Sequence, residues 1–220
     1  LGGAAVGVPG SISGIFEIHS KFGSLPISEL FQPAIDLARN GFIVTKKQES
    51  ALEEKLDDFI KINGENSLFS KKYKEGDTIK VENLAKTLEK IAIEGPDGFY
   101  KGEIADLIEM EMIKNGGLVS KEDLENYKAV YREPVIGNYR GFKIISMAPP
   151  SSGGALLIQM LNMLENYDIS SINRNSANYA HLFTEVERLA YADRAMHLGD
   201  PDFWNNPIEM LTSKQYALDR

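Results

Sequence analysis

The stretch from Tyr139 to Met163 constrains the fold most, because an apolar strand runs there into a helix through a turn of prolines, serines and glycines. The turn is Ala148–Gly154, with the sequence APPSSGG. A proline cannot donate a hydrogen bond to a neighbouring strand, so the strand is predicted to end here. The glycines permit a sharp turn, and a serine can cap the helix predicted from Ala155 to Glu165. The stretch therefore predicts a strand–turn–helix unit.

Four residues of this turn are candidates for substrate binding, namely Ser151, Ser152, Gly153 and Gly154. The N-terminus of a helix that follows a strand carries free backbone N–H groups, which can bind a carboxylate or a phosphate. The same residues also suit a structural role, in which the glycines make the turn and a serine caps the helix. We favour the structural role, and we expect a bulky residue at Gly153 to be harmful through strain or a clash.

Composition excludes several classes of function. Of the 220 residues, 43% are hydrophobic and 25% are charged, which suffices for one large or two small cored domains. The net charge of −8 and the lack of a basic stripe argue against nucleic-acid binding. Without cysteine there is no disulfide or thiolate metal site, and no apolar run reaches the ~18 residues of a membrane span. No cofactor and no metal are predicted.

Apolar residues recur at helical spacing along most of the chain, and glycine, proline or asparagine ends many of these runs. The period changes to that of strands between Ala129 and Met147, where two or three strands are predicted around Gly137-Asn138 and Arg140-Gly141. The apolar run Ala4–Val8 predicts a buried strand, and Thr78–Val81 a short extended piece. Helices are predicted for Ile12–Phe22, Pro26–Asn40, Thr45–Ile62, Leu84–Ala92, Gly102–Lys114, Ser120–Tyr127, Ser176–Leu198 and Pro207–Leu211. The fold class is α+β and rich in helices.

A second candidate for chemistry lies on the longest helix, where Asp193 and His197 stand four residues apart. This spacing puts two side chains on one helix face, where they could ligate a metal or form an acid–base pair. No further ligand lies near them in the sequence, so an intrahelical pair with Arg194 beside it is favoured. Serine catalysis is not indicated either, because Ser151-Ser152-Gly153 lacks the Gly-x-Ser-x-Gly pattern.

Several motifs together resemble the γ-glutamyltranspeptidase family. They occur in the order of the family and span nearly the whole chain, so that agreement by chance is implausible. The matching segments are Gly2–Gly10, Gly23–Pro26, Gln32–Ala38, Ile93–Gly102, Gly116–Leu124, Tyr131–Pro134, Pro149–Gly154, Tyr191–Arg194 and Leu198–Phe203.

The resemblance implies an N-terminal-nucleophile hydrolase with a four-layer αββα architecture. Members of the family are synthesised as a precursor that cleaves itself into a large and a small subunit. The new N-terminal threonine of the small subunit then attacks glutathione-like substrates. The α-amino group of that threonine serves as its base, because a hydroxyl is a weak nucleophile until an adjacent base activates it. The expected partners are thus a small γ-glutamyl substrate and the small subunit from the same precursor. A periplasmic or secreted location is possible for the family.

The chain resembles the C-terminal part of the large subunit, so residues 1–220 are predicted to form one partial domain. The catalytic threonine is then expected downstream of Arg220, and the arginine that holds the substrate carboxylate upstream of Leu1. Neither role is assigned to Thr212 or Arg132, because their places along the chain do not match the order of the family's motifs. No catalytic residue is therefore predicted here. The chain alone is expected to be inactive, and its uncovered strand edges favour self-association.

Two further functions are compatible with the sequence. The first is that of a non-catalytic helical scaffold or binding module of the same ancestry. The second is that of a related acylase that cleaves cephalosporin side chains or poly-γ-glutamate. The sequences on both sides of this chain would separate the enzyme from the scaffold, since an upstream arginine and a downstream threonine support the enzyme.

Overall fold

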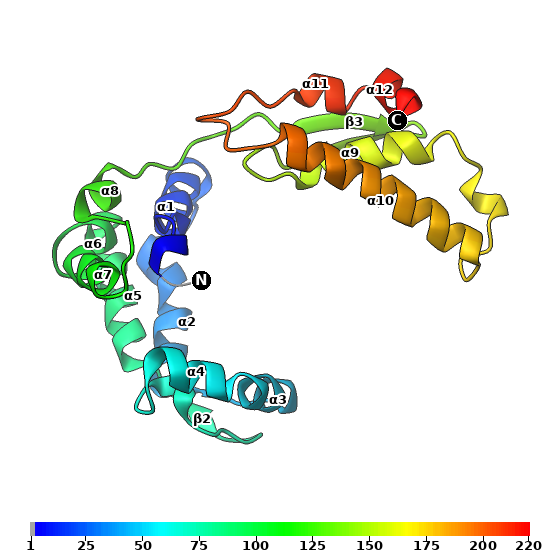
Figure 1. Cartoon of the computed structure of the whole chain (residues 1–220). Coiled ribbons are helices and arrows are strands. Elements are labelled where there is room, and N and C mark those ends of the chain that lie inside the picture. The colour runs from blue at the N-terminus through cyan, green and yellow to red at the C-terminus, as the bar shows by residue number, and fades with distance from the viewer. Residues whose placement is uncertain (1–2) are drawn as a thin grey trace. The chain divides into compact units, whose positions relative to one another are not determined.

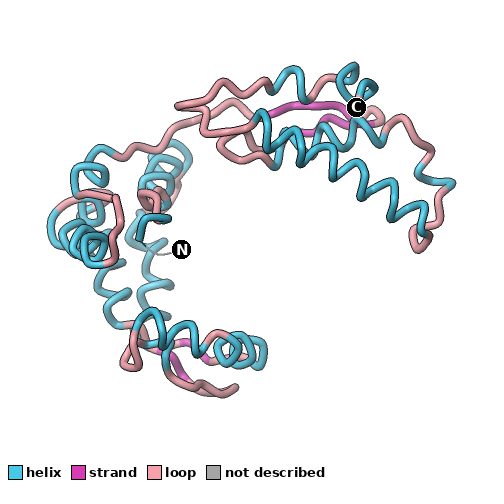
Figure 2. The backbone as a smooth tube through the Cα atoms, viewed as in Figure 1, coloured by secondary structure: helices cyan, strands magenta, loops and turns pink. Residues whose placement is uncertain are grey.

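The computed structural model describes residues 3–220, and the chain divides after Val130 into two compact units (Figure 1). Helices dominate both units, and each unit contains one two-stranded antiparallel sheet (Figure 2). The helix-rich α+β class is thus confirmed. The prediction that residues 1–220 form one partial domain is not tested by this division and stays a prediction.

The first unit is a set of helices with one short strand pair. Its elements are η1 (Gly3–Ala5), α1 (Ser11–Phe22), α2 (Ile27–Asn40), β1 (Phe42–Ile43), α3 (Lys46–Glu54), α4 (Leu56–Asn63), η2 (Leu68–Ser70), β2 (Thr78–Ile79), α5 (Glu82–Glu94), α6 (Asp97–Tyr100), α7 (Gly102–Lys114) and α8 (Lys121–Asn126).

Two apolar clusters hold this unit together. The first joins α2 and α5 through Phe31, Ile35 and Ile91. The second lies between α6, α7 and α8, where Leu124 is fully buried. The apolar periodicity predicted these helices because their inward positions repeat every three or four residues.

Two predictions in the first unit are wrong. The run Ala4–Val8 is not a strand: η1 covers its start, and Ala4, Ala5 and Val6 are exposed. Within the described residues no strand lies beside it, so an apolar run alone cannot form one. The helix predicted for Thr45–Ile62 is two helices, since Lys55 leaves the helical region with φ −100° and ψ 3°.

An apolar groove lies between α1 and α2. It encloses about 590 Å³, and among its lining residues are Ile15, Ile18, Phe22 and Leu30, which are between 45 and 69% exposed. So much uncovered apolar surface is typical of a face that another part of a protein covers.

The second unit is built on a β-hairpin and two long helices. Its elements are β3 (Val135–Tyr139), β4 (Phe142–Ser146), α9 (Gly153–Leu164), η3 (Ile169–Ser171), α10 (Ala177–His197), α11 (Ile208–Leu211) and α12 (Lys214–Asp219). The hairpin turns at Arg140 and Gly141, whose φ values of 49° and 86° suit a tight two-residue turn. Gly137-Asn138 lies inside β3 instead of forming a second turn.

The hairpin has one covered and one open face. Helix α9 packs on the covered face, where Gly137 leaves room for Ile158: a Cβ at this glycine would lie 2.6 Å from Ile158 Cγ2. Ile136 pairs with Ile145 on the opposite face, and they are 52 and 61% exposed. A two-stranded sheet is marginally stable in water without cover on its apolar faces. The open face therefore needs a further layer.

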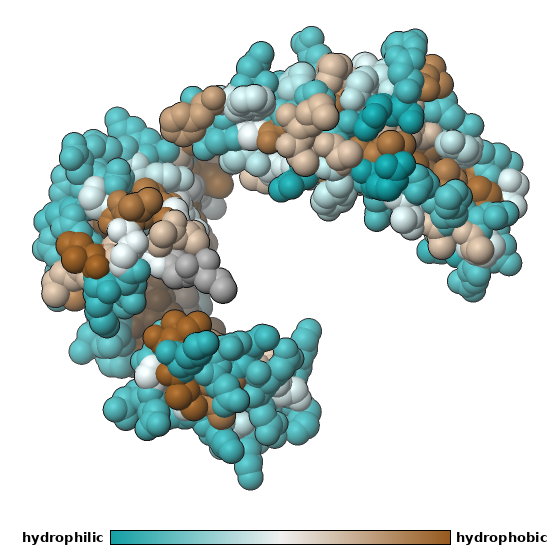
Figure 3. Space-filling model, viewed as in Figure 1, coloured by the Kyte–Doolittle hydropathy of each residue, from teal (hydrophilic) through white to brown (hydrophobic). Residues whose placement is uncertain are grey.

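The surface is mixed in character. In Figure 3 hydrophobic side chains form separate groups among hydrophilic ones on each unit. No helix within residues 3–220 has the length and apolar content needed to cross a bilayer.

Candidate functional site

The strand–turn–helix unit predicted from the sequence is present. Strand β4 ends at Ser146 and α9 begins at Gly153. Gly154 makes the closest approach in the turn, because a Cβ on it would lie 2.2 Å from the carbonyl oxygen of Met147. A Cβ on Gly153 would meet only Ser151 Oγ, at 3.4 Å. The tight backbone approach is therefore at the second glycine.

The two serines of the turn have different partners. Ser152 occupies the N-cap position of α9, but its side chain makes no capping hydrogen bond. Its Oγ instead accepts a hydrogen bond from Arg194 Nε on α10, at 3.0 Å. Ser151 Oγ accepts from the backbone N–H of Gly153 at 3.3 Å. The expected serine cap at the N-cap position is therefore absent, and Ser151, one residue earlier, bonds the first N–H of the helix instead.

These contacts predict that the serines stabilise the turn. We expect Ser151→Ala and Ser152→Ala each to lower the free energy of unfolding by about 0.5–2 kcal/mol, because each removes one hydrogen bond. Urea unfolding of the purified chain measures this change. Ser50→Ala is the control, since it also removes one serine hydrogen bond, to the Lys46 carbonyl, but at an exposed residue within a single helix where it joins no second element, so a smaller loss is expected. Serine variants as stable as the control would contradict the structural role.

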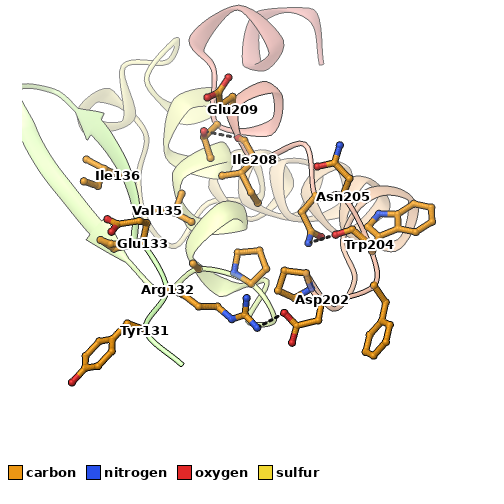
Figure 4. Close-up of a pocket in the computed structure, with 17 residues that line it drawn as sticks. Tyr131, Arg132, Glu133, Val135, Ile136, Asp202, Trp204, Asn205, Ile208 and Glu209 are labelled. Atoms are coloured by element: carbon orange, nitrogen blue, oxygen red, sulfur yellow. Dashed lines mark hydrogen bonds and ion pairs between the residues drawn. The ribbon is translucent and has the colours of Figure 1, made fainter. Parts of the chain in front are cut away.

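A cavity of about 880 Å³ opens beside the start of this turn. It lies between the segment that leads into β3, the end of β4 and the loop after α10 (Figure 4). Residues Tyr131–Ile136, Ala148, Pro149, Pro201–Asn206, Ile208, Glu209 and Thr212 line it. Ala148 and Pro149 belong to the predicted turn, whereas Ser151, Ser152, Gly153 and Gly154 do not line the cavity.

An ion pair crosses the cavity wall. Arg132 Nη2 lies 2.8 Å from Asp202 Oδ1, and Figure 4 shows the two side chains meeting. The indole of Trp204 is held by a hydrogen bond from its Nε1 to the carbonyl of His197, at 2.8 Å. The wall also carries the carboxylates of Glu133 and Glu209. The lining is thus acidic and aromatic, with its one arginine already paired.

The cavity contains no activated nucleophile among the described residues that line it. The Thr212 hydroxyl donates to the carbonyl of Ile208 at 2.7 Å, and no histidine lines the wall. A nucleophilic hydroxyl needs an adjacent base, which is missing at this position. The choice not to assign catalysis to Thr212 or substrate binding to Arg132 stays a prediction.

The predicted pairing of Asp193 with His197 or Arg194 is wrong. Asp193 is 3% exposed and turns into the unit, where its carboxylate accepts hydrogen bonds from Gln159 on α9 and from Arg220 after α12. Arg194 bonds Ser152 instead. Helical spacing showed which residues share a face of α10, but only packing decides which neighbouring helix that face meets.

Comparison with known proteins identifies the family. The family model described as Gamma-glutamyltranspeptidase matches residues 1–220. The glutathione hydrolase proenzyme of Escherichia coli strain K12 is 48% identical over 97% of this chain and 37% of its own length. The acylase ACY 1 proenzyme of Pseudomonas sp. strain SE83 is 40% identical over 100% of this chain and 40% of its own length.

A solved structure agrees with these sequences. The crystal structure of Helicobacter pylori γ-glutamyltranspeptidase superposes with a TM-score of 0.93 at 44% identity, over 99% of this chain and 64% of that one. The predicted N-terminal-nucleophile hydrolase fold is confirmed by this likeness. The chain spans less than half of the length of the two curated relatives. It belongs to the γ-glutamyltranspeptidase family.

Proposed function

We propose that the protein of which this chain is a part cleaves the γ-glutamyl amide bond of glutathione-type substrates. The γ-glutamyl group would pass through an acyl-enzyme on a threonine to water or to an amino acid or peptide. The match of the family model to residues 1–220 carries this proposal. The relative from E. coli, named a glutathione hydrolase proenzyme, supports the substrate and a precursor form of the protein.

In this proposal the present chain supplies framework, and the reacting groups come from the rest of the precursor. Three observations support that division of roles. The 880 Å³ cavity beside the turn has no activated nucleophile among the residues that line it. The outer face of the β3–β4 hairpin is open, and the groove between α1 and α2 is apolar and uncovered. Such surfaces fit cover by the remaining polypeptide. Self-association of the isolated chain stays a prediction.

The assay compares the full-length, processed protein with the isolated 220-residue chain. Both are incubated with a γ-glutamyl anilide, with and without a dipeptide acceptor. The full-length protein is expected to release the aniline, and to release it faster with the acceptor if transfer competes with hydrolysis. The isolated chain is expected to release none, because the threonine and the carboxylate-binding arginine lie outside it.

Two results would contradict the proposal. Absence of release from every γ-glutamyl amide tested would remove the proposed activity and favour the scaffold of the same ancestry. Turnover by the isolated chain would show that the reacting groups lie within residues 1–220 after all.

A related acylase is the second candidate, and the 40% identity to the acylase ACY 1 proenzyme favours it over a non-catalytic scaffold. The same full-length preparation is tested with a cephalosporin that carries an amide-linked side chain. A higher kcat/KM for this amide than for the γ-glutamyl anilide would assign the protein to the acylases. The two amides differ in both the acyl group and the leaving amine, so the comparison shows which whole substrate the protein prefers.

A further inference from the structure

A buried carboxylate joins three helices of the second unit. Asp193 on α10 accepts a hydrogen bond from Gln159 Nε2 on α9 at 2.5 Å. Its oxygens also lie 2.8 Å from Arg220 Nη2 and 3.2 Å from Arg220 Nε. Burial, followed by the nearby charge of Asp193, raises the pKa of the Tyr216 phenol on α12. Asp193 is the only charged residue of the described chain that is buried.

Donors from two other elements surround the Asp193 carboxylate. An isolated carboxylate is costly to bury, whereas a two-pronged contact with a guanidinium offsets much of that cost. Gln159 is 0% exposed and turns its amide N–H toward the carboxylate, although its own Oε1 is then left without a partner. An unpaired buried acceptor is itself unfavourable. The Gln159 amide thus donates to Asp193, while the Gln159 oxygen stays without a hydrogen-bond partner.

Polar contacts hold α12 at both of its ends. Before its first turn, Asn162 Nδ2 on α9 donates to the carbonyl of Thr212 at 2.7 Å. In the first turn Lys214 forms an ion pair with Glu165 and donates to the carbonyl of Asn138. At its end, Arg220 and Tyr216 reach Asp193.

Apolar packing also holds α12, because Ala217 belongs to a buried cluster with Met163, Leu164 and Val186. The helix has six residues, of which Ala217 is buried and Leu218 is 62% exposed. A helix this short is not stable by itself, so its contacts decide where it lies. The contact of Asp193 with Arg220 thus helps to fix the C-terminal end of α12.

We propose that Asp193 is a positioning residue for self-cleavage of the precursor, because it anchors α12 and thereby the polypeptide that continues toward the cleavage junction. This inference rests on the proposed function, and it concerns a residue that touches neither substrate nor the cleaved bond. The carboxylate acts through Arg220 and Tyr216, which belong to the anchored segment. Cleavage then depends on where α12 holds the following residues.

The test uses the full-length precursor with the double substitution Asp193→Asn and Arg220→Gln. Asp193→Asn keeps the size of its side chain and Arg220→Gln shortens it, and both charges are lost together, so that no unpaired buried charge remains to unfold the unit. Arg220→Lys is a milder variant, which keeps the positive charge and loses the two-pronged contact. Arg188→Gln is the matched control, because Arg188 pairs with Glu185 on the exposed face of the same helix.

Three quantities are measured for each precursor: the first-order rate of self-cleavage, the melting temperature, and the hydrogen exchange of amides 214–220. The cleavage rate is taken well below the melting temperature of every variant, so that it reports on folded protein. The double variant is expected to be cut about 10- to 100-fold more slowly, since small displacements of reacting groups have effects of this size. Its amides 214–220 should exchange faster, Arg220→Lys should lie between it and wild type, and Arg188→Gln should match wild type.

The outcomes separate the inference from the function on which it rests. If the wild-type precursor is cut and the double variant is cut at the same rate, the positioning role is overturned and the proposed function stands, whatever the melting temperature does. If the wild-type precursor is never cut, the proposed self-cleavage fails and the positioning role fails with it. Slow cleavage with a nearly unchanged melting temperature supports the role, because loss of stability alone does not produce it.

Discussion

Gly154→Ala is expected to lower the free energy of unfolding by more than about 3 kcal/mol, at the upper end of what overpacking produces. The new Cβ would lie 2.2 Å from the carbonyl oxygen of Met147 and 3.0 Å from the backbone nitrogen of the same residue. Both are main-chain atoms between β4 and α9, so a side-chain rotation cannot relieve the clash. The strand and the helix must separate to accommodate one methyl group.

Gly153→Ala is the matched control, one residue earlier in the same turn. Its Cβ would meet only Ser151 Oγ at 3.4 Å, which is an ordinary contact. Alanine is also the better helix former, so the change is expected to be neutral or stabilising by up to about 1 kcal/mol. Urea unfolding of the purified chain compares the two variants. Equal midpoints for Gly154→Ala and wild type would contradict the packing of this turn.

The identity of the sensitive glycine is a correction. The sequence predicted harm from a bulky residue at Gly153 through strain or a clash, whereas the close backbone approach is at Gly154. Two adjacent glycines look alike in a sequence. Which of them faces the preceding strand depends on the exact path of the turn.

Ile91→Ala is expected to destabilise the first unit by about 2–5 kcal/mol, the range for removing a large aliphatic side chain from a packed core. Ile91 is 1% exposed and packs in the cluster with Phe31, Ile35, Ala38 and Ala85 between α2 and α5. Alanine leaves a cavity there that the two helices can fill only in part.

Ile93→Ala on the same helix controls for the change in side chain. Ile93 is 82% exposed, so its replacement should change the free energy of unfolding by less than about 0.5 kcal/mol in this chain. Urea denaturation followed by circular dichroism measures both variants. A smaller loss for Ile91→Ala than for Ile93→Ala would show that α5 faces α2 with a different side.

The helices were predictable where local signals and apolar periodicity agreed. In α2 the apolar stripe begins after Pro26 and ends at Gly41, and the helix has the bounds Ile27–Asn40. The capping pattern Ser120-Lys121-Glu122-Asp123 likewise begins α8, with both reciprocal hydrogen bonds present. A similar box at Thr45 and Gln48 was missed, although threonine followed by glutamine three residues later is a known signal.

The candidate site was predictable only in part. The turn Ala148–Gly154 stands out in the sequence, and its first two residues, Ala148 and Pro149, line the 880 Å³ cavity. The ion pair of Arg132 with Asp202 was not foreseen, because 70 residues separate the two. The partners of Asp193 were not foreseen for the same reason. Side chains distant in sequence meet only when helices pack, and no local pattern records that.

The sequence by itself determined the family, the helix-rich fold class and most helix positions, because these depend on ordered motifs and on patterns within a few turns of chain. The tertiary structure alone decided three other matters. It decided that Gly154 rather than Gly153 lies against Met147 just after β4, that Asp193 faces α9 and α12, and that no strand of the described residues pairs with Ala4–Val8. Each depends on which surfaces meet across long stretches of chain, and such contacts are set by packing of the whole unit instead of by neighbouring residues.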